Sequence, residues 1–451
     1  MKKNVVVVGG GIAGLASAIY LARGGCNVTI FEKRRHVGGR AITHLRHGFR
    51  FNLGPHMVVR KGAGRSVYRE LGIPIRGGRS KTYGSALIAK QHHKLPLTLP
   101  SLLFTSLLNT KGKFEAASVL RRIRKMDTSV LAAATIGEWL DANVVDARVR
   151  ILTEALVRLA TYSPDLRQTA SAALSQVDLF LRGVVYIDEG WQKIVDALQS
   201  NAVTAGVNFV TSSRVIRVVH DDAVRALDLG GLEEEQRDTT VEILRPDPTP
   251  ADATGARLAA ETVILAVDPS TAMQMVGGAA FARGWGSLKP VTATCLDVAL
   301  SRLPDPKRTF AIGFDRPVYF GVHSAHAQLT PQGGAMVHVA KYETERLVSY
   351  DDNYDDDELV RMTEATRAVE GELEAVLDNV QPGWREFVMH RRFLPSLTVS
   401  NVLMTPGVTR PPVATSVRGL YLAGDWVGDE GMMADASLAS ARAVARAILA
   451  K

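Results

Sequence analysis

The pattern of apolar and polar residues at the start of the chain predicts a strand, a turn, a helix and a second strand. Asn4–Val8 is a short β-branched run, which is typical of a strand buried in a parallel sheet. A glycine-rich turn follows it, and Leu15–Arg23 then has the composition of a helix. Gly24 and Gly25 end that helix, and Asn27–Phe31 is the second apolar strand. The beginning of the chain therefore predicts one β-α-β unit.

Two later parts of the chain continue this pattern. Near the C-terminus an apolar strand over residues 419–423 leads through a loop to a helix of small residues that reaches Leu449. The middle of the chain adds one amphipathic helix and three short strands, over residues 193–205, 207–210, 214–219 and 262–267. Residues 220–258 are polar and predict exposed hairpins.

Two longer blocks separate these parts. The block 76–184 is predicted to be helical, because residues 136–143 and 148–162 have apolar positions at helix spacing. The block 270–414 begins with an alternating strand over 290–300. It continues with predicted strands over 309–314 and 334–341 and a long helix near 357–377.

These elements predict an α/β fold class with two domains. A Rossmann-like domain is expected to hold residues 1–75, 185–269 and 415–451. A discontinuous substrate domain of α+β type, with a mixed sheet plus helices, is expected to hold residues 76–184 and 270–414.

Composition places the 451-residue chain among globular proteins, with 46% hydrophobic and 22% charged residues. Lys and Arg outnumber Asp and Glu by 54 to 46, and the formal net charge of +8 attracts anions. No zinc-finger spacing or basic-aromatic repeat accompanies that charge, so we expect no nucleic-acid partner.

Cellular location follows from two further features. No uncharged apolar run reaches the ~20 residues that cross a bilayer. The two cysteines, Cys26 and Cys295, lie far apart in the sequence and fit a reducing compartment. We expect a cytoplasmic protein, or one that is peripheral at a membrane.

The first β-α-β unit contains a G-x-G-x-x-G turn, formed by Gly9, Gly11 and Gly14. The first glycine permits a tight turn, the second lets a pyrophosphate approach the backbone, and the third lets the helix pack on the strand. The helix start at Ile12 and Ala13 offers free N–H groups and the positive end of the helix dipole. Glu32, at the end of the second strand, is placed to accept hydrogen bonds from a ribose diol. An acid there favours NAD or FAD over NADP.

A second glycine-rich segment follows the second predicted strand. It reads Lys33-Arg34-Arg35-His36-Val37-Gly38-Gly39-Arg40-Ala41, and Gly48–His56 comes soon after. Together these segments resemble the FAD-binding N-terminus of the amine oxidase, protoporphyrinogen oxidase and phytoene desaturase superfamily, where a G-G-R loop lies over the pyrophosphate. A guanidinium such as that of Arg40 supplies a fixed fork of donors to phosphate. The resemblance implies cofactor contacts from Lys33, Gly38, Gly39, Arg40, Gly54, Pro55 and His56.

The C-terminal strand and helix resemble the second flavin motif of the same superfamily. The strand ends at Gly424 and Asp425, and the helix begins near Met432 and Met433. The resemblance implies that Gly424 and Asp425 hold the ribityl chain and that the N–H groups of the two methionines meet the flavin pyrimidine edge. A helix start at that edge stabilises the negative charge of a reduced flavin. It also implies that Val215 contacts the adenine through its backbone.

The predicted cofactor is therefore FAD. No cysteine lies within residues 400–440, so a thioether link to the flavin is not supported, and we expect noncovalent FAD. The C-terminal motif looks nearer to phytoene-desaturase-like proteins than to monoamine oxidases.

Candidates for catalysis lie beside the two flavin motifs. His56 can act as an acid or a base, because the reference pKa of a histidine is close to neutral. Trp426 is a second polar-tipped residue, and both also fit a purely packing role. Lys289 and Lys341 are candidates for the lysine that holds a water in many amine oxidases. No metal-ligand spacing is found, so we expect no metal, and the acidic run 351–357 is interpreted as a solvated loop and helix start.

An uncharged stretch over residues 95–108 is flanked by cations on both sides. Two interpretations stay open. The stretch is the wall of an apolar substrate pocket, or residues 95–125 form a peripheral membrane contact with apolar groups in the headgroup layer and cations on anionic lipids. Both indicate a hydrophobic substrate.

The sequence thus predicts an FAD-dependent dehydrogenase or desaturase that passes a hydride from a hydrophobic, isoprenoid-like small molecule to flavin N5. Three alternatives stay open. They are an amine or amino-acid oxidase that releases peroxide, a protoporphyrinogen-type oxidase, and a flavoprotein partner that has lost catalysis. Substrate identity, the electron acceptor and the oligomeric state are not determined by these motifs.

Overall fold

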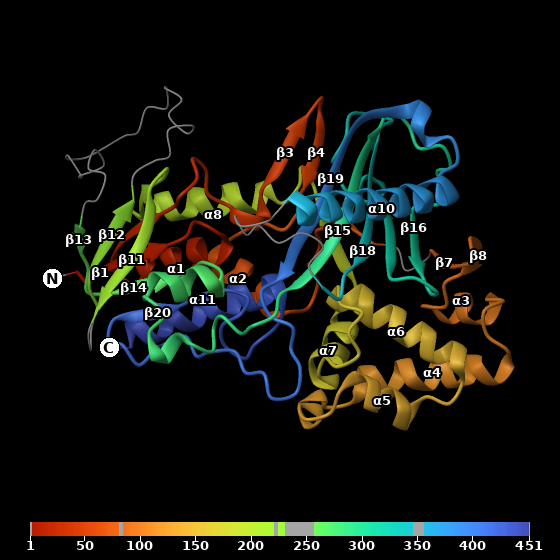
Figure 1. Cartoon of the computed structure of the whole chain (residues 1–451), viewed down its shortest axis with the longest axis horizontal. Helices are drawn as coiled ribbons and strands as arrows, with labels where there is room; N and C mark the ends of the chain where they lie inside the picture. The colour runs from red at the N-terminus through yellow and green to blue at the C-terminus, as the bar shows by residue number, and fades with distance from the viewer. Residues whose placement is uncertain (1, 81–83, 221–223, 231–256, 346–355, 451) are drawn as a thin grey trace.

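A five-stranded parallel sheet forms one half of the molecule, at the left of Figure 1. The computed structural model describes residues 2–80, 84–220, 224–230, 257–345 and 356–450. The sheet draws its strands from the start, the middle and the end of the chain. Their order is β10 (Asn208–Val210), β2 (Asn27–Phe31), β1 (Asn4–Val8), β14 (Val263–Leu265) and β20 (Leu420–Leu422).

Both faces of this sheet are covered, so its strands are mainly apolar. One face packs on four helices, which are α1 (Ile12–Arg23), α2 (Ala63–Leu71), α8 (Gln192–Thr204) and α11 (Met433–Leu449). The other face packs on α9 (Pro269–Met275) and on a small antiparallel sheet of β11 (Arg214–His220), β12 (Val224–Gly230) and β13 (Arg257–Ala259). Burial of β-branched side chains from both faces supplies the apolar area that stabilises such a sheet.

A seven-stranded mixed sheet forms the other half of the molecule. Its order is β19 (Val388–Ser400), β15 (Val291–Leu300), β18 (Ala335–Tyr342), β17 (Val318–Val322), β16 (Phe310–Gly313), β7 (Ser85–Ile88) and β8 (Gln91–Lys94). The long helix α10 (Asp356–Val380) crosses one face of this sheet, as Figure 1 shows.

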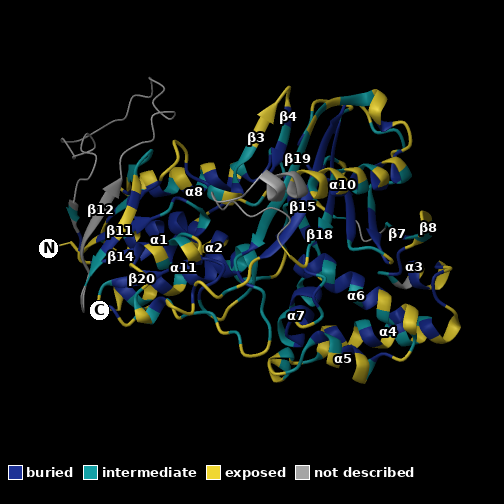
Figure 2. Cartoon of the chain, viewed as in Figure 1, coloured by how far each residue is buried: buried dark blue, intermediate teal, exposed yellow. Residues whose placement is uncertain are grey.

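A group of helices lies beneath the seven-stranded sheet in Figure 1 and shares a core with it. These helices are α3 (Leu99–Phe104), α4 (Thr110–Lys125), α5 (Ile136–Asn143), α6 (Ala147–Thr161) and α7 (Ala170–Leu181). Figure 2 shows buried residues along both sheets and exposed residues on the outer sides of α4, α5 and α10.

Short strands connect the two halves of the molecule. The hairpin of β3 (Thr43–Arg46) and β4 (Phe49–Asn52) packs against the seven-stranded sheet, and β9 (Val184–Ile187) pairs with β5 (Val58–Val59) and β6 (Gly77–Arg79).

The predicted fold class is confirmed, since the structure contains a Rossmann-like parallel sheet and a mixed sheet with helices. One detail of the prediction is wrong. The block 76–184 is not only helical, because β7 and β8 pair at the edge of the mixed sheet, a tertiary contact that four-residue segments do not reveal. The predicted strand over 290–300 is present as β15, and it is buried at all ten positions.

Some predictions fall on parts of the chain that lie outside the described residues. These include most of the polar stretch 220–258 and most of the acidic run 351–357. The division into the predicted domain segments stays a prediction. Within the described residues, no helix is long and apolar enough to cross a membrane.

Candidate functional site

A cavity of about 1020 Å³ lies between the two halves of the molecule. Its wall runs from the glycine turn after β1, through the segments after β2 and β4, to the start of α11 and the helices α6 and α7. The carboxyl ends of parallel strands are the usual place for a dinucleotide. The volume is at the upper end of the range for small-molecule pockets, and it suits a large cofactor together with a substrate.

The three glycines of the turn meet different surroundings. Gly9 has φ +105°, and a Cβ there would lie 2.5 Å from the carbonyl oxygen of Ala266. A Cβ on Gly14 would collide with the carbonyl oxygen of Gly9, so this glycine permits α1 to pack on the turn. A Cβ on Gly11 would meet no protein atom within 4 Å, and this glycine lines the cavity. Its open side therefore leaves room for a ligand at the backbone.

Glu32 lies at the cavity wall with both carboxylate oxygens already in use. Its Oε2 accepts a hydrogen bond from the N–H of Gly10 at 2.8 Å, and its Oε1 accepts one from the N–H of Arg34 at 2.9 Å. A carboxylate oxygen can accept more than one hydrogen bond, so these two bonds hold Glu32 in place without preventing a contact with a ribose.

Two helices begin at the cavity without a side-chain cap. The N-cap residues are Gly11 for α1 and Met432 for α11, and neither side chain accepts a hydrogen bond from the first turn. By contrast, α5 and α6, which begin elsewhere, are capped by Thr135 and Asp146. The N–H groups at the start of α1 and α11 are thus available to an anion or to a carbonyl group, and the helix dipole favours negative charge there.

The two flavin motifs, at opposite ends of the chain, meet through an ion pair. Arg40 Nη2 donates to Asp425 Oδ2 at 2.8 Å, and the Asp425 side chain is only 1% exposed. Asp425 also accepts hydrogen bonds from the backbone N–H and the side-chain Nδ2 of Asn401, at 3.1 and 2.8 Å. Arg40 lines the cavity, as the motif implies, and it also holds Asp425, which the motif did not predict. Asn401 was missed because nothing in its local sequence marks it.

His56 lies on the cavity wall, on the loop that follows β4. Its Nδ1 donates to the carbonyl of Gly54 at 3.2 Å, and its ring meets Trp191 edge-on at a centroid distance of 5.0 Å. Burial lowers the pKa of His56 to about 4, so its imidazole is neutral at neutral pH.

The structure brings most of the predicted cofactor residues to one wall. The cavity is lined by Gly9, Gly11, Ile12, Ala13, Glu32, Lys33, Gly38, Gly39, Arg40, Pro55, His56, Val215, Gly424, Asp425, Met432 and Met433. Gly14 and Gly54 lie behind this wall. Gly54 has φ +76°, and a Cβ there would lie 2.5 Å from Cδ2 of Leu397.

Trp426 and the two candidate lysines lie elsewhere. Trp426 is fully buried, donates from Nε1 to the carbonyl of Val267 at 2.9 Å, and packs on Trp285. Lys341 pairs with Glu372 of α10 at 2.8 Å. Among the residues that line the cavity, neither Lys289 nor Lys341 occurs, and Trp426 is absent as well. Trp426 therefore has a packing position rather than the expected place beside the flavin.

Two groups on the wall were not identified from the sequence. One is an apolar end, formed by Leu159 and Ala160 of α6, Phe180 of α7, Leu397 of β19 and Tyr162. The other is Asp435 in the first turn of α11, whose carboxylate lies against Gly62 and Gly64 at the start of α2. Burial raises the pKa of Asp435 to about 6. The apolar residues carry no motif, because their place depends on how distant segments pack. Asp435 stands within the C-terminal motif, but its contact with α2 was not predicted.

The parallel sheet, the glycine turn and the two uncapped helix starts define a dinucleotide-binding protein. The chain belongs to the flavin containing amine oxidoreductase family, whose model matches residues 12–449. It is thereby a flavin-dependent oxidoreductase, as the sequence predicted. The open side of Gly11, the held carboxylate of Glu32 and the helix starts fit FAD.

Three proteins illustrate this similarity. An oxidoreductase from Methanosarcina mazei shares the fold, with a TM-score of 0.73, 17% identity, and coverage of 99% of this chain and 100% of the other. Cyclohexylamine oxidase from Brevibacterium oxydans has a TM-score of 0.64 and 16% identity over 100% of this chain and 99% of its own. The 4,4'-diaponeurosporene oxygenase of Staphylococcus aureus is 40% identical over 59 residues. That match spans only 13% of this chain and 12% of the relative's own length.

Proposed function

We propose that this protein is a dehydrogenase or desaturase that holds FAD without a covalent bond and oxidises an uncharged, hydrophobic small molecule of an isoprenoid kind. The bound flavin would supply the hydride acceptor at N5. The local similarity to a diaponeurosporene oxygenase supports this substrate class, although it covers a short segment only.

The observation that carries the proposal is the neutrality of the apolar end of the cavity. Leu159, Ala160, Phe180 and Leu397 line it, together with the polar but uncharged side chains of Tyr162 and Gln176. Burial raises the pKa of Tyr162 well above its ordinary value, and its hydroxyl donates to the carbonyl of Pro55 at 3.1 Å. A cationic amine would lose its hydration here without finding a carboxylate, which is unfavourable. A hydrocarbon chain would bury its surface at no such cost.

The carboxylates that line the cavity belong to other parts of the fold. Glu32 and Asp425 are held by backbone and side-chain donors in the cofactor motifs, Asp268 caps α9, and Asp435 lies against the start of α2. The protein would therefore orient the substrate by shape and exclude water, while the neutral imidazole of His56 lines the wall beside it.

Amine oxidation is the second candidate function, because the family includes oxidases of amines by its description. A spectrum of the purified protein before and after acid precipitation tests the cofactor, since noncovalent FAD moves into the supernatant. Anaerobic mixing then tests the substrate. A hydrophobic polyene that bleaches the flavin supports the proposal. Bleaching by aliphatic amines, with peroxide released in air, would favour the second candidate instead.

We also propose that the tip formed by α3 and the start of α4 rests on an anionic lipid surface. No described residue of the segment 95–108 lines the cavity, so this segment does not form the wall of that pocket. Leu95, Leu102, Leu107 and Leu108 pack into the helical core. Leu103, Phe104 and Phe114, in contrast, point outward and are 67%, 74% and 75% exposed.

Cations surround this exposed patch of Leu103, Phe104 and Phe114. Lys94 Nζ lies 5.4 Å from the centre of the Phe104 ring, and Lys113 Nζ donates to the carbonyl of Leu103 at 2.7 Å. Aromatic and apolar groups in the headgroup layer combined with lysines near anionic lipids are the usual means of peripheral binding.

Liposome co-sedimentation tests this contact. We expect binding to vesicles that contain phosphatidylserine, weaker binding at high salt, and a loss of at least tenfold in affinity for Phe104→Ser combined with Phe114→Ser. Val203→Ser is the matched control, because Val203 is 59% exposed on α8 in the other half of the molecule. Equal binding by the double variant and the wild type would contradict the proposal.

A further inference from the structure

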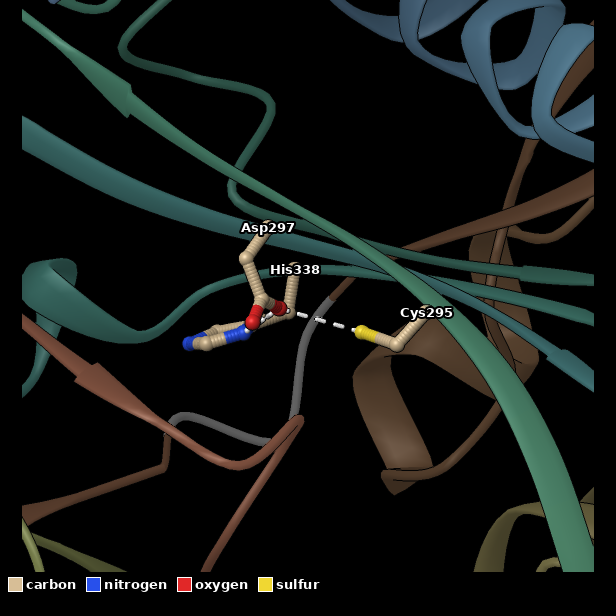
Figure 3. Close-up of side chains that lie close together, drawn as sticks. All are labelled: Cys295, Asp297 and His338. Atoms are coloured by element: carbon tan, nitrogen blue, oxygen red, sulfur yellow. Dashed lines mark hydrogen bonds and ion pairs between the residues drawn. The ribbon is translucent and has the colours of Figure 1, made fainter. Parts of the chain in front are cut away.

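A buried charge lies inside the seven-stranded sheet, behind the wall of the cavity. Cys295 and Asp297 sit two residues apart on one face of β15, and His338 stands opposite Asp297 on β18. All three side chains are fully buried. Figure 3 shows that the sulfur of Cys295 and an imidazole nitrogen of His338 both point at the carboxylate of Asp297. None of these residues belongs to a cofactor motif.

Four hydrogen bonds converge on the Asp297 carboxylate. His338 Nδ1 lies 2.6 Å and Cys295 Sγ 3.0 Å from Oδ1, while Arg392 of β19 donates to Oδ2 from Nη2 at 2.5 Å and from Nε at 3.2 Å. Burial alone would raise the pKa of Asp297, but His338 and Arg392 outweigh it and hold the pKa below its ordinary value. Asp297 is therefore an ionised carboxylate whose charge Arg392 balances.

Arg392 links this charge to the cavity. Its Nη2 also donates to the carbonyl oxygen of Asn52, the last residue of β4. The Asn52 side chain in turn accepts hydrogen bonds from Thr43 Oγ1 at 2.7 Å and from the N–H of Trp191 at 3.0 Å. The loop that begins at Asn52 ends at His56.

The same loop is held at two further points by segments outside the parallel sheet. Gly54 packs so closely on Leu397 of β19 that no side chain fits between them. Tyr162 donates to the carbonyl of Pro55. Residues 53, 55 and 56 line the cavity, so the position of this loop decides the shape of the wall where the flavin motif is expected.

We propose that Asp297 is a positioning residue, which orients Arg392 so that Arg392 holds the loop Asn52–His56 against the FAD-binding cavity. The inference rests on the proposed binding of FAD in that cavity. The seven-stranded sheet would then affect the environment of the flavin in two ways: through residues that line the cavity, and through the buried ion pair of Asp297 and Arg392.

The same three side chains could be taken for a metal site, because their ligand atoms lie within 4.8 Å of one another. Two observations favour the positioning role. The guanidinium of Arg392 already occupies one side of the carboxylate. Burial and the charge of Asp297 raise the pKa of the Cys295 thiol well above its ordinary value, so the sulfur keeps its proton and donates to Asp297.

The test compares Asp297→Asn, Arg392→Met and the double variant with the wild type, all loaded with FAD. We expect each single variant to lose at least tenfold in FAD affinity and to change the visible circular dichroism of the bound flavin. The double variant should be no worse than either single variant, because both act through one contact. Arg391→Met is the matched control. Arg391, the neighbouring residue on β19, pairs with Glu370 and Glu374 of α10, and its loss should leave both readouts unchanged.

The outcomes separate this inference from the proposed function. A wild type that binds no FAD overturns both. A wild type that binds FAD, together with a folded Asp297→Asn that has the same affinity and the same flavin dichroism, overturns the inference alone. If Asp297→Asn does not fold, Arg392→Lys carries the same test, because it keeps the charge and removes the fork that reaches Asn52. Stoichiometric zinc in the wild type that is lost in Cys295→Ser would assign the cluster to a metal and overturn the positioning role.

Discussion

The parallel sheet and the mixed sheet hold their polar groups in two different ways. The parallel sheet presents them to the cavity at its ends, through backbone N–H groups, glycines and the carboxylate of Glu32 at strand and helix termini. The mixed sheet holds Asp297 and Arg392 within its strands, behind the cavity wall, with their charges paired inside the fold. Backbone chemistry at a strand end needs little more than a local turn. A charge inside a sheet needs its partner, and that partner comes from another strand.

The largest effect is expected for a substitution in the glycine turn of the parallel sheet. Gly14→Ala places a methyl group against the carbonyl oxygen of Gly9. Because α1 packs tightly on the turn, there is no room for this group. We expect the free energy of unfolding to fall by about 3 kcal/mol, measured by chemical denaturation.

Gly11→Ala is the matched control for that variant. Its Cβ meets no protein atom within 4 Å, so we expect stability to stay within about 1 kcal/mol of the wild type. FAD affinity should nevertheless fall at least tenfold, since the methyl group points at the place of the pyrophosphate. Equal loss of stability in the two variants would contradict the separate roles of these glycines.

A smaller effect is expected where the two ends of the chain meet. Asp425→Asn removes the charge that Arg40 and Asn401 hold, and it leaves their donors facing an amide. The Arg40 side chain is 42% exposed and can be hydrated in the variant. We therefore expect the free energy of unfolding to fall by about 2 kcal/mol, which is less than the loss of a partner in a fully buried ion pair. FAD retention should also be weaker. Asp429→Asn, in the exposed loop that follows, should change stability by less than about 0.5 kcal/mol. Thermal unfolding with and without FAD distinguishes the two effects.

The smallest effect is a pH dependence that comes from Asp435. Its pKa is raised from the ordinary value of 3.8 to about 6, so folding favours the protonated form. The associated stability is fully present below pH 3.8 and is lost as the pH rises through about 6. Relative to Asp435→Asn, the wild type without cofactor should lose about 1 kcal/mol between pH 4 and pH 6 after allowance for solvent screening. A constant difference between the two proteins across that interval would contradict the raised pKa.

Much of the half that contains the parallel sheet was predictable because its motifs are local. The β1-α1-β2 unit, the glycine spacing and Glu32 all lie within one short segment, and the structure forms β1, α1 and β2 as the pattern indicates. The pairing of Arg40 with Asp425 was not predictable, since 385 positions separate the two residues. Asn401 and Asp435 were missed for the same reason.

The half that contains the mixed sheet and the helices α3–α7 was less predictable. The stretch 95–108 reads as one apolar segment, yet the fold buries Leu102 and exposes Leu103 and Phe104. The strand over 290–300 was predicted, but not what covers it: α10 packs on one face of β15 and the segments around β4 pack on the other. Asp297 is therefore a fully buried charge.

The sequence by itself determined the class of protein, because glycine turns, helix starts and a ribose acceptor are made by residues close together in the chain. Only the tertiary structure decided where Trp426 points, which residues form the apolar end of the cavity, and how Asp297, His338 and Arg392 come together. The physical reason is the range of the interactions involved. Backbone conformation is set by neighbours along the chain, whereas burial and charge pairing are set by neighbours in space.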